Sequence, residues 1–145
     1  MIMDNKIELN ALQTEQQVRE LALSIMRACG AIHESLRELS GKAEKENSTL
    51  PYALLTEEYA LRSRANTLII EASRLARAGI TFSQQEMLET LELLDERIKE
   101  TTSLKDLAEL INSATLFANS AMSMQPSVLS FLLKNLQGAV NKIEL

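Results

Sequence analysis

The chain has 145 residues, a length that suits one domain, and its formal net charge at pH 7 is −5. A single cysteine excludes an intrachain disulfide, and no apolar run of signal-peptide length lies near the N-terminus, so we expect a cytoplasmic protein. With two prolines, four glycines and no tryptophan, the composition favours helix over sheet and predicts one all-α helical-bundle domain over residues 1–145.

The first expected helix spans about residues 14–40. Thr14 and Gln17 have the spacing of an N-terminal capping box, and Gly41 is placed to cap the other end. Residues 1–13 are expected to form a flexible arm or an extra turn of helix, and residues 41–50 a solvated loop. Apolar residues recur every three or four positions, as in a helix that buries one face in a bundle: Val18, Leu21, Ala22, Ile25, Cys29, Ile32, Leu36 and Leu39.

The second expected helix spans residues 51–79. Pro51 suits the first helical turn and Gly79 the end. The spacing of its apolar residues matches that of the first helix: Leu54, Leu61, Ala65, Leu68, Ala72 and Leu75. Because only the 41–50 segment joins the two helices, we expect them to form a long antiparallel hairpin.

Three shorter helices are expected in the second half of the chain. The third begins at Ser83, where Glu86 completes a capping box and Phe82 can pack on Met87. The fourth begins at Ser103 and the fifth at Pro126. Their inner residues are Gln84, Met87, Leu91, Leu94 and Ile98 in the third, Leu104, Leu107, Ala108, Ile111, Ala114, Ala118 and Ala121 in the fourth, and Leu129, Leu132, Leu136, Val140 and Ile143 in the fifth. The predicted fold is an up-down bundle of about five helices.

Cys29 and His33 are the only cysteine and the only histidine, and they lie four positions apart on one helical face. Cys29 falls within the apolar stripe, where a free thiol behaves as a small hydrophobe. A zinc site needs about four nitrogen or sulfur ligands, which this chain reaches only if a symmetric dimer pools two such pairs. We therefore predict no metal, no cofactor and no catalytic residue here.

Charged residues are unevenly distributed along the chain. Residues 83–109 contain eight acidic and three basic residues, and we interpret this acidic run as a solvated face or a surface for a basic partner. In the second helix, Glu58 with Arg62 and Glu71 with Arg74 have ion-pair spacing. The alternative to surface pairing is a phosphate-binding or acidic-peptide patch formed by Arg62, Arg64, Arg74 and Arg77. An acidic chain lacks general attraction to phosphate, so neither nucleic acid nor membrane is an expected partner.

Residues 104–122 resemble a helix-turn-helix, with Asn112 at the turn. The would-be recognition helix, residues 113–122, contains no lysine or arginine, although phosphate contacts supply most DNA-binding affinity. One continuous amphipathic helix accounts for the same residues. A DNA-binding regulator is therefore the alternative function, and a metal-dependent bundle enzyme the second alternative.

Residues 110–133 form a run of 24 residues without a charge. Asparagines and five serines make the run too polar to span a bilayer, whereas loss of charge with Met and Phe retained is typical of protein interfaces. Burial at the centre of the bundle is the other explanation. We predict a non-enzymatic interaction protein, an adaptor, inhibitor or chaperone-like partner, that forms a homodimer through this region. The interface hypothesis names Ala114, Phe117, Ala118, Ala121, Met122, Met124, Val128 and Phe131.

Overall fold

A computed structural model describes residues 9–45, 49–123 and 125–142. Residues 1–8 of the expected arm, residues 46–48 of the expected loop, Met124 of the predicted interface and residues 143–145 lie outside this description. The described ranges fold into six mutually packed helices: α1 (Glu15–Lys45), α2 (Leu50–Ile70), α3 (Ala72–Leu75), α4 (Gln84–Glu100), α5 (Leu104–Ser123) and α6 (Pro126–Lys142). The predicted all-α bundle is confirmed, with one short extra helix.

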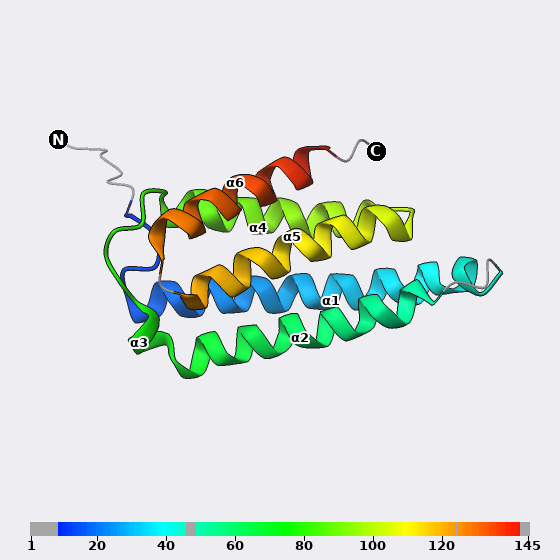
Figure 1. The fold of residues 1–145 in the computed structure, drawn as a ribbon, viewed down its shortest axis with the longest axis horizontal. Helices are drawn as coiled ribbons and strands as arrows, with labels where there is room; N and C mark the ends of the chain where they lie inside the picture. Colours follow the sequence, from blue (N-terminus) through cyan, green and yellow to red (C-terminus); the bar gives the residue numbers. More distant parts are fainter. Residues whose placement is uncertain (1–8, 46–48, 124, 143–145) are drawn as a thin grey trace.

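The first two long helices form the expected antiparallel hairpin. In Figure 1, α1 and α2 lie side by side and run in opposite directions, with α2 at one edge of the bundle. The backbone N–H of Arg77, beyond α3, donates to the carbonyl of Leu12, before α1, over 2.8 Å. On its other side α1 packs against α4, and α5 packs against α2 and α6. Helices α4 and α6 lie along the edge of Figure 1 that is opposite α2.

The helix starts predicted from capping residues are confirmed. Thr14 Oγ1 accepts from the Gln17 N–H over 3.1 Å, and Gln17 Oε1 accepts from the Thr14 N–H over 3.1 Å, which is a complete capping box. Ser83 accepts from the Glu86 N–H over 3.0 Å and Ser103 from the Asp106 N–H over 3.1 Å. Such caps use partners three residues away, which is why the sequence alone locates them.

The expected end of the first helix at Gly41 is wrong. Helix α1 continues through Gly41 to Lys45, and among the described glycines it is Gly79, not Gly41, that has a positive φ. A C-terminal glycine cap requires the left-handed conformation. Residues 42–45 are Lys, Ala, Glu and Lys, which favour helix enough to extend it through one glycine. The solvated loop expected over residues 41–50 is therefore shorter than predicted.

The second helix does not reach Gly79 as expected. It is interrupted at Glu71, and α3 ends at Leu75, after which Ala76 is extended with ψ 133°. The next N–H, that of Arg77, is bonded to Leu12 rather than to a carbonyl one turn earlier. Gly79 turns the chain in the left-handed region at φ 97°. Tertiary hydrogen bonding, which no local pattern reports, ends this helix early.

Residues 9–13 are held against the start of α4 and do not form the expected free arm. Asn10 and Ser83 pair in an isolated antiparallel bridge. The Leu12 N–H donates to Gln84 Oε1 over 3.1 Å, and Gln84 Nε2 donates to the carbonyl of Gln17 over 3.0 Å. Leu12 is buried and has a positive φ of 61°, a conformation disfavoured for leucine. The hydrogen bonds and burial offset this local strain.

The apolar stripes predicted from periodicity form one continuous core. Phe117 of α5 is fully buried, and its ring centroid lies 6.5 Å from that of Phe82. Ile143, assigned to the fifth stripe, lies outside the described residues. Within the described ranges, no helix is both long enough and apolar enough to cross a bilayer.

Candidate functional site

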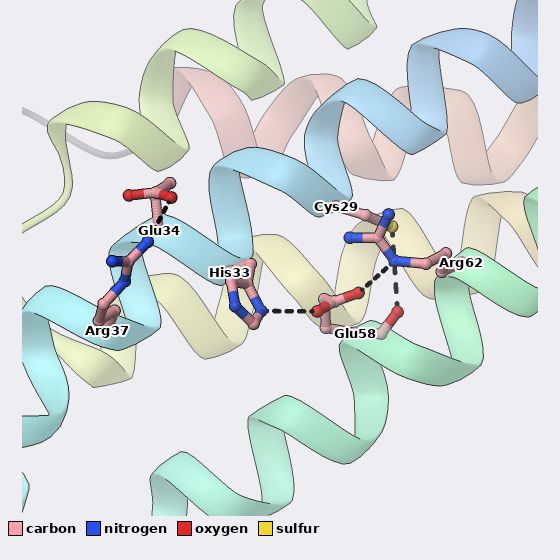
Figure 2. Close-up of polar contacts among 6 residues, drawn as sticks. All are labelled: Cys29, His33, Glu34, Arg37, Glu58 and Arg62. Atoms are coloured by element: carbon pink, nitrogen blue, oxygen red, sulfur yellow. Dashed lines mark hydrogen bonds and ion pairs between the residues drawn. The ribbon is translucent and has the colours of Figure 1, made fainter.

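Cys29 and His33 of α1 both point towards Glu58 of α2, as Figure 2 shows. His33 Nδ1 lies 3.3 Å from Glu58 Oε1, and the Cys29 thiol lies 3.9 Å from the Glu58 backbone carbonyl. Arg62, one turn further along α2, donates from Nε to Glu58 Oε2 over 2.9 Å. We call Cys29, His33, Glu58 and Arg62 the Glu58 cluster.

The carboxylate at the centre of the Glu58 cluster is completely buried, whereas its two partners are open to solvent. The Glu58 side chain is 0% exposed, against 50% for His33 and 42% for Arg62. A buried carboxylate is tolerated when it is paired and hydrogen-bonded, and each Glu58 oxygen has one such partner. The cluster is thus a polar link between α1 and α2 at the edge of the core.

The sequence predicts the Glu58–Arg62 pair but not the burial of Glu58 or its contact with His33. His33 is 25 residues away, so no local spacing relates the two. One signal was present: Glu58 lies four residues after Leu54 and three before Leu61, within the inner stripe of α2. An acid at an apolar stripe position indicates a buried charge whose partner comes from another helix.

Cys29 is a buried structural residue, as predicted. Its side chain is 0% exposed, and burial raises the pKa of the thiol to about 11 from an ordinary 9.0. The Arg62 guanidinium opposes this rise in the pKa, and the Glu58 carboxylate adds to it. The thiol is therefore protonated at neutral pH, and a protonated thiol is a poor nucleophile.

The acidic run lies mostly on the solvated face of α4, as the sequence predicts. On α4, Asp95 is the partly buried member, with a side chain 15% exposed and a 3.0 Å ion pair to Lys99, and Asp106 and Glu109 are partly buried on α5. In the ranges that the structure describes, no three His, Cys, Asp or Glu side chains gather as metal ligands would. The exposed members are Glu86, Glu89, Glu92, Glu96 and Glu100.

The groove between α1 and α4 has a volume of about 420 Å³ and contains charges of both signs. Lys99 pairs with Asp95 on one wall, and Glu34 pairs with Arg37 beside the other. This mixture of signs selects no class of charged ligand. The lining residues are Arg27, Gly30, Ala31, Glu34, Ser35, Glu38, Asp95 and Lys99.

The arginines of the second expected helix do not converge on a common patch. Burial lowers the pKa of Arg77, which lies beyond α3 and donates to backbone carbonyls. The expected Glu58–Arg62 and Glu71–Arg74 pairs are both present. The partners are Glu58 for Arg62, Asn119 for Arg64 at 2.8 Å, Glu71 for Arg74 at 2.8 Å, and the carbonyls of Leu75 and Ala121 for Arg77.

The helix-turn-helix interpretation of residues 104–122 is wrong. Helix α5 runs without a break from Leu104 to Ser123, and Asn112 is a helical residue rather than a turn. Continuous apolar spacing on one face keeps the helix intact, since the turn of such a motif needs a residue that interrupts it. The separate recognition helix on which the DNA-binding alternative depends is not formed.

Half of the predicted interface residues face the inside of the chain. Ala114, Phe117, Ala118 and Ala121 are each at most 4% exposed, which corrects their assignment to an outer surface. The reason is that α5 packs against α1, α2, α4 and α6, so most of its missing charge reflects burial. Met122 is partly buried, whereas Val128 is 38% exposed and Phe131 69% exposed on α6, so Phe131 faces outward.

The outer side of α2 carries a long uncharged surface that the sequence analysis missed. Tyr52 is 76% exposed, Tyr59 57% and Ile70 81%. The signal was that this helix has large apolar or aromatic residues on two opposite sides, with Tyr52, Tyr59 and Ile70 on the side away from Leu54, Leu61 and Leu68. We call this surface the α2 face; its members are Tyr52, Ala53, Thr56, Tyr59, Ala60, Ser63, Asn66 and Ile70, all exposed.

Uncharged residues are also exposed on the neighbouring helix α5, where Asn112 is exposed and Leu116 is 38% exposed. The charged Arg64 lies between these residues and the α2 face, because it reaches from α2 to Asn119 of α5. These contacts and exposed surfaces are the evidence for function, since no protein-family model, no curated protein and no solved structure matches the chain.

Proposed function

We propose that this protein is a non-enzymatic, cytoplasmic helical interaction protein, acting as an adaptor, inhibitor or chaperone-like partner, and that it self-associates as a homodimer. The observation that carries the proposal is the α2 face, with its two exposed tyrosines and Ile70. Large exposed apolar surfaces on soluble domains mark sites of protein contact, and tyrosine is enriched at their centres.

A comparison within the chain supports this assignment. The exposed side of α4 carries Glu at five positions, as a solvated helix surface normally does. The α2 face carries no charge over a similar length, and the nearest partly exposed charge is Arg62, which lies at its border. Solvent exposure alone therefore does not explain why the exposed residues of the α2 face are uncharged.

The Glu58 cluster supports a non-catalytic role. Its carboxylate is 0% exposed, and its thiol is protonated at neutral pH because burial raises the pKa of Cys29. A general base must reach the proton that it abstracts, and a thiol attacks as the thiolate. These groups stabilise the contact between α1 and α2.

Sedimentation velocity at micromolar concentration tests self-association. We expect a species of twice the 16.2 kDa chain mass. Tyr59→Glu should weaken the dimer at least about 100-fold, because burying an unpaired carboxylate costs several kcal/mol. Circular dichroism checks that the variant stays helical. A wild type that sediments only as a monomer at these concentrations would contradict the proposal.

Phe131→Glu is the matched control, since Phe131 is also an exposed aromatic residue (69%, against 57% for Tyr59) but lies on α6, away from α2 in Figure 1. We expect it to leave the dimer intact. Dissociation by Phe131→Glu with no effect of Tyr59→Glu would place the interface on α6, at the exposed members of the surface predicted from the sequence, and would contradict the assignment to the α2 face.

A further inference from the structure

We infer that His33 is a modification site, at which the outer ring nitrogen, Nε2, accepts a phosphoryl group from a small donor with a labile phosphorus–nitrogen bond. Four features of the Glu58 cluster carry this assignment: the carboxylate behind the ring, the exposure of the ring, the charge that the transfer places on it, and the arginines beside it. A stoichiometric acceptor does not turn over, so a non-enzymatic protein can have such a site. The assignment does not depend on self-association.

The buried carboxylate determines which ring nitrogen of His33 carries the proton. Glu58 pairs with Arg62 as a carboxylate, and a carboxylate can only accept hydrogen bonds. Because His33 Nδ1 lies 3.3 Å from Glu58 Oε1, Nδ1 is the donor in this contact. The neutral ring then has its lone pair on Nε2, the nitrogen that can attack an electrophile. A buried carboxylate behind Nδ1 fixes the tautomer and the orientation of a reactive histidine in this way.

The His33 ring is open to solvent on the side that reacts. Its side chain is 50% exposed, and Glu58 is the hydrogen-bond partner that it has among the described residues. Figure 2 shows Nδ1 directed towards Glu58, so that the rest of the ring faces away from the carboxylate. The other nucleophilic group of the cluster, the Cys29 thiol, is buried and protonated at neutral pH, because burial raises its pKa. An electrophile therefore reaches His33 first.

Phosphoryl transfer places a positive charge on the ring, directly in front of the buried carboxylate. The lone pair of Nε2 forms a bond to phosphorus while the phosphorus–nitrogen bond of the donor breaks, and the leaving ammonia takes that electron pair. The proton stays on Nδ1, so the ring becomes an imidazolium that carries the phosphoryl group on Nε2. Glu58 is 0% exposed and in place before the reaction, so it stabilises this charge with little screening by water. It is thus a positioning residue for His33.

Two guanidinium groups close to His33 favour a phosphoryl group over uncharged electrophiles. Arg62 uses Nε for the other oxygen of the Glu58 carboxylate, which leaves its terminal nitrogens for a further anion. Arg37 follows His33 by one turn of α1, and residues four apart are neighbours on a helix surface. Its pair with Glu34 is exposed on both sides, and such a pair is easily exchanged for another anion. Guanidinium groups match phosphate oxygens in charge and geometry.

Reaction of the full-length protein with potassium phosphoramidate at neutral pH tests the assignment. His33 is the only histidine, so intact mass should show one added phosphoryl group, and phosphorus NMR should place it on Nε2 alone. We expect the folded protein to react at least about tenfold faster than a peptide of residues 30–37, which lacks the buried carboxylate. A rate equal to that of the peptide, or attachment to Nδ1, would overturn the assignment.

Glu58→Gln tests the carboxylate with little change of shape. The amide oxygen can still accept from Nδ1, but it carries no charge, so the rate should fall at least about tenfold, close to that of the peptide. Circular dichroism and thermal unfolding check that the variant is folded, and an unchanged rate in the folded variant would contradict the role of Glu58. The wild type provides an independent readout. A mixture of the two ring isomers, in the proportion that the peptide gives, would show that no carboxylate orients the ring.

Arg37→Gln tests the contribution of the guanidinium groups. We expect it to slow the reaction with phosphoramidate about two- to threefold, since an exposed charge contributes modestly. Arg19→Gln is the matched control, because Arg19 is also a partly exposed arginine of α1 that pairs with a glutamate, here Glu15, but it lies several turns from His33. Equal rates in the two variants would show that Arg37 does not assist, and would overturn the choice of a phosphoryl donor.

Discussion

Glu58 puts a carboxylate at a stripe position where the rest of α2 has leucine or alanine. Its two oxygens are bonded to residues from two different helices, His33 of α1 and Arg62 of α2 itself. Removing one partner of a buried ion pair lowers the free energy of unfolding by more than the intact pair contributes to it, because the remaining charge stays desolvated. The stability of the α1–α2 contact therefore depends on polar residues that are largely exposed.

Arg62→Ala should lower the free energy of unfolding by about 1–3 kcal/mol, since it leaves the buried Glu58 oxygen without its guanidinium. Urea denaturation followed by circular dichroism measures the change. Arg37→Ala is the control, because Arg37 pairs with Glu34 where both side chains are more than half exposed, and such pairs contribute little (Figure 2). Equal decreases in the free energy of unfolding in the two variants would show that the Glu58–Arg62 pair stabilises the fold no more than an exposed ion pair does.

Cys29 should make stability fall with pH in the alkaline range. The folded thiol has a pKa of about 11 against 9.0 for an ordinary thiol, so below pH 9 its protonated form is present in both states and its contribution is constant. Between pH 9 and 11 only the unfolded state loses the proton, which favours unfolding by about 2–3 kcal/mol in total. The difference in unfolding free energy between wild type and Cys29→Ala, measured from pH 8 to 11, isolates this effect. A constant difference would show an exposed thiol.

At the level of single elements, the two glycines that lie before and after α2 in the chain, Gly41 and Gly79, have opposite roles. Gly41 lies within α1, is exposed, and has no atom within 4 Å of the position where a Cβ would be added. Gly79 has φ +97°, and an added Cβ would lie 3.5 Å from the Pro126 ring. A side chain is therefore compatible with the backbone at Gly41 and strained at Gly79.

Gly41→Ala should raise the free energy of unfolding by about 0.5–1 kcal/mol, because alanine restricts the unfolded chain and favours helix. Gly79→Ala should lower it by about 1–2 kcal/mol, since alanine must adopt a left-handed conformation. Thermal denaturation of both variants provides the comparison. Destabilisation by Gly41→Ala would indicate that α1 ends before this residue.

The elements that the sequence predicts correctly are those set by nearby residues. Ser83 and Ser103 begin helices through bonds to N–H groups three residues later, and Pro126 begins one through its own ring geometry. The errors arise where a distant residue decides the structure. The Leu12 carbonyl accepts a hydrogen bond from the Arg77 N–H, which would otherwise have continued the helix after Leu75.

In the candidate site, too, the sequence predicts the features that depend on nearby residues and misses those that depend on distant ones. The exposure of Phe131 and the Glu58–Arg62 pair follow from helical spacing. The contact of Glu58 with His33 depends on the pairing of two helices, and the burial of Ala114 depends on the packing of four others around α5. The α2 face also needed tertiary information, because only packing shows which of two apolar sides of α2 is covered.

At the scale of the whole molecule, charged and uncharged surfaces lie on opposite sides. The acidic side of α4 and the α2 face belong to helices at opposite edges of the bundle in Figure 1. Two copies joined through α2 would keep their acidic helices far apart, well beyond the ~10 Å over which charges interact at ordinary ionic strength. The net charge of −5 therefore does not oppose such a dimer.

The dimer should accordingly be insensitive to salt. Raising sodium chloride from about 50 mM to about 500 mM should change the dissociation constant by less than about threefold, since the α2 face itself carries no charge. Analytical ultracentrifugation at both concentrations measures this. A dimer that tightens more than about tenfold with salt would indicate that the acidic surfaces of α4 face each other.

The attachment of Leu12 to Gln84 also determines when this protein can finish folding during its synthesis. The two residues are separated by 72 positions, so a ribosome that adds ~5–20 residues per second makes Gln84 about 4–14 s after Leu12. During that interval α1 can form with its own capping box at Thr14 and Gln17, but the residues before it lack the contact that holds Leu12 against α4. The earliest described segment of the chain to be translated is thus secured only after more than half of the protein has been made.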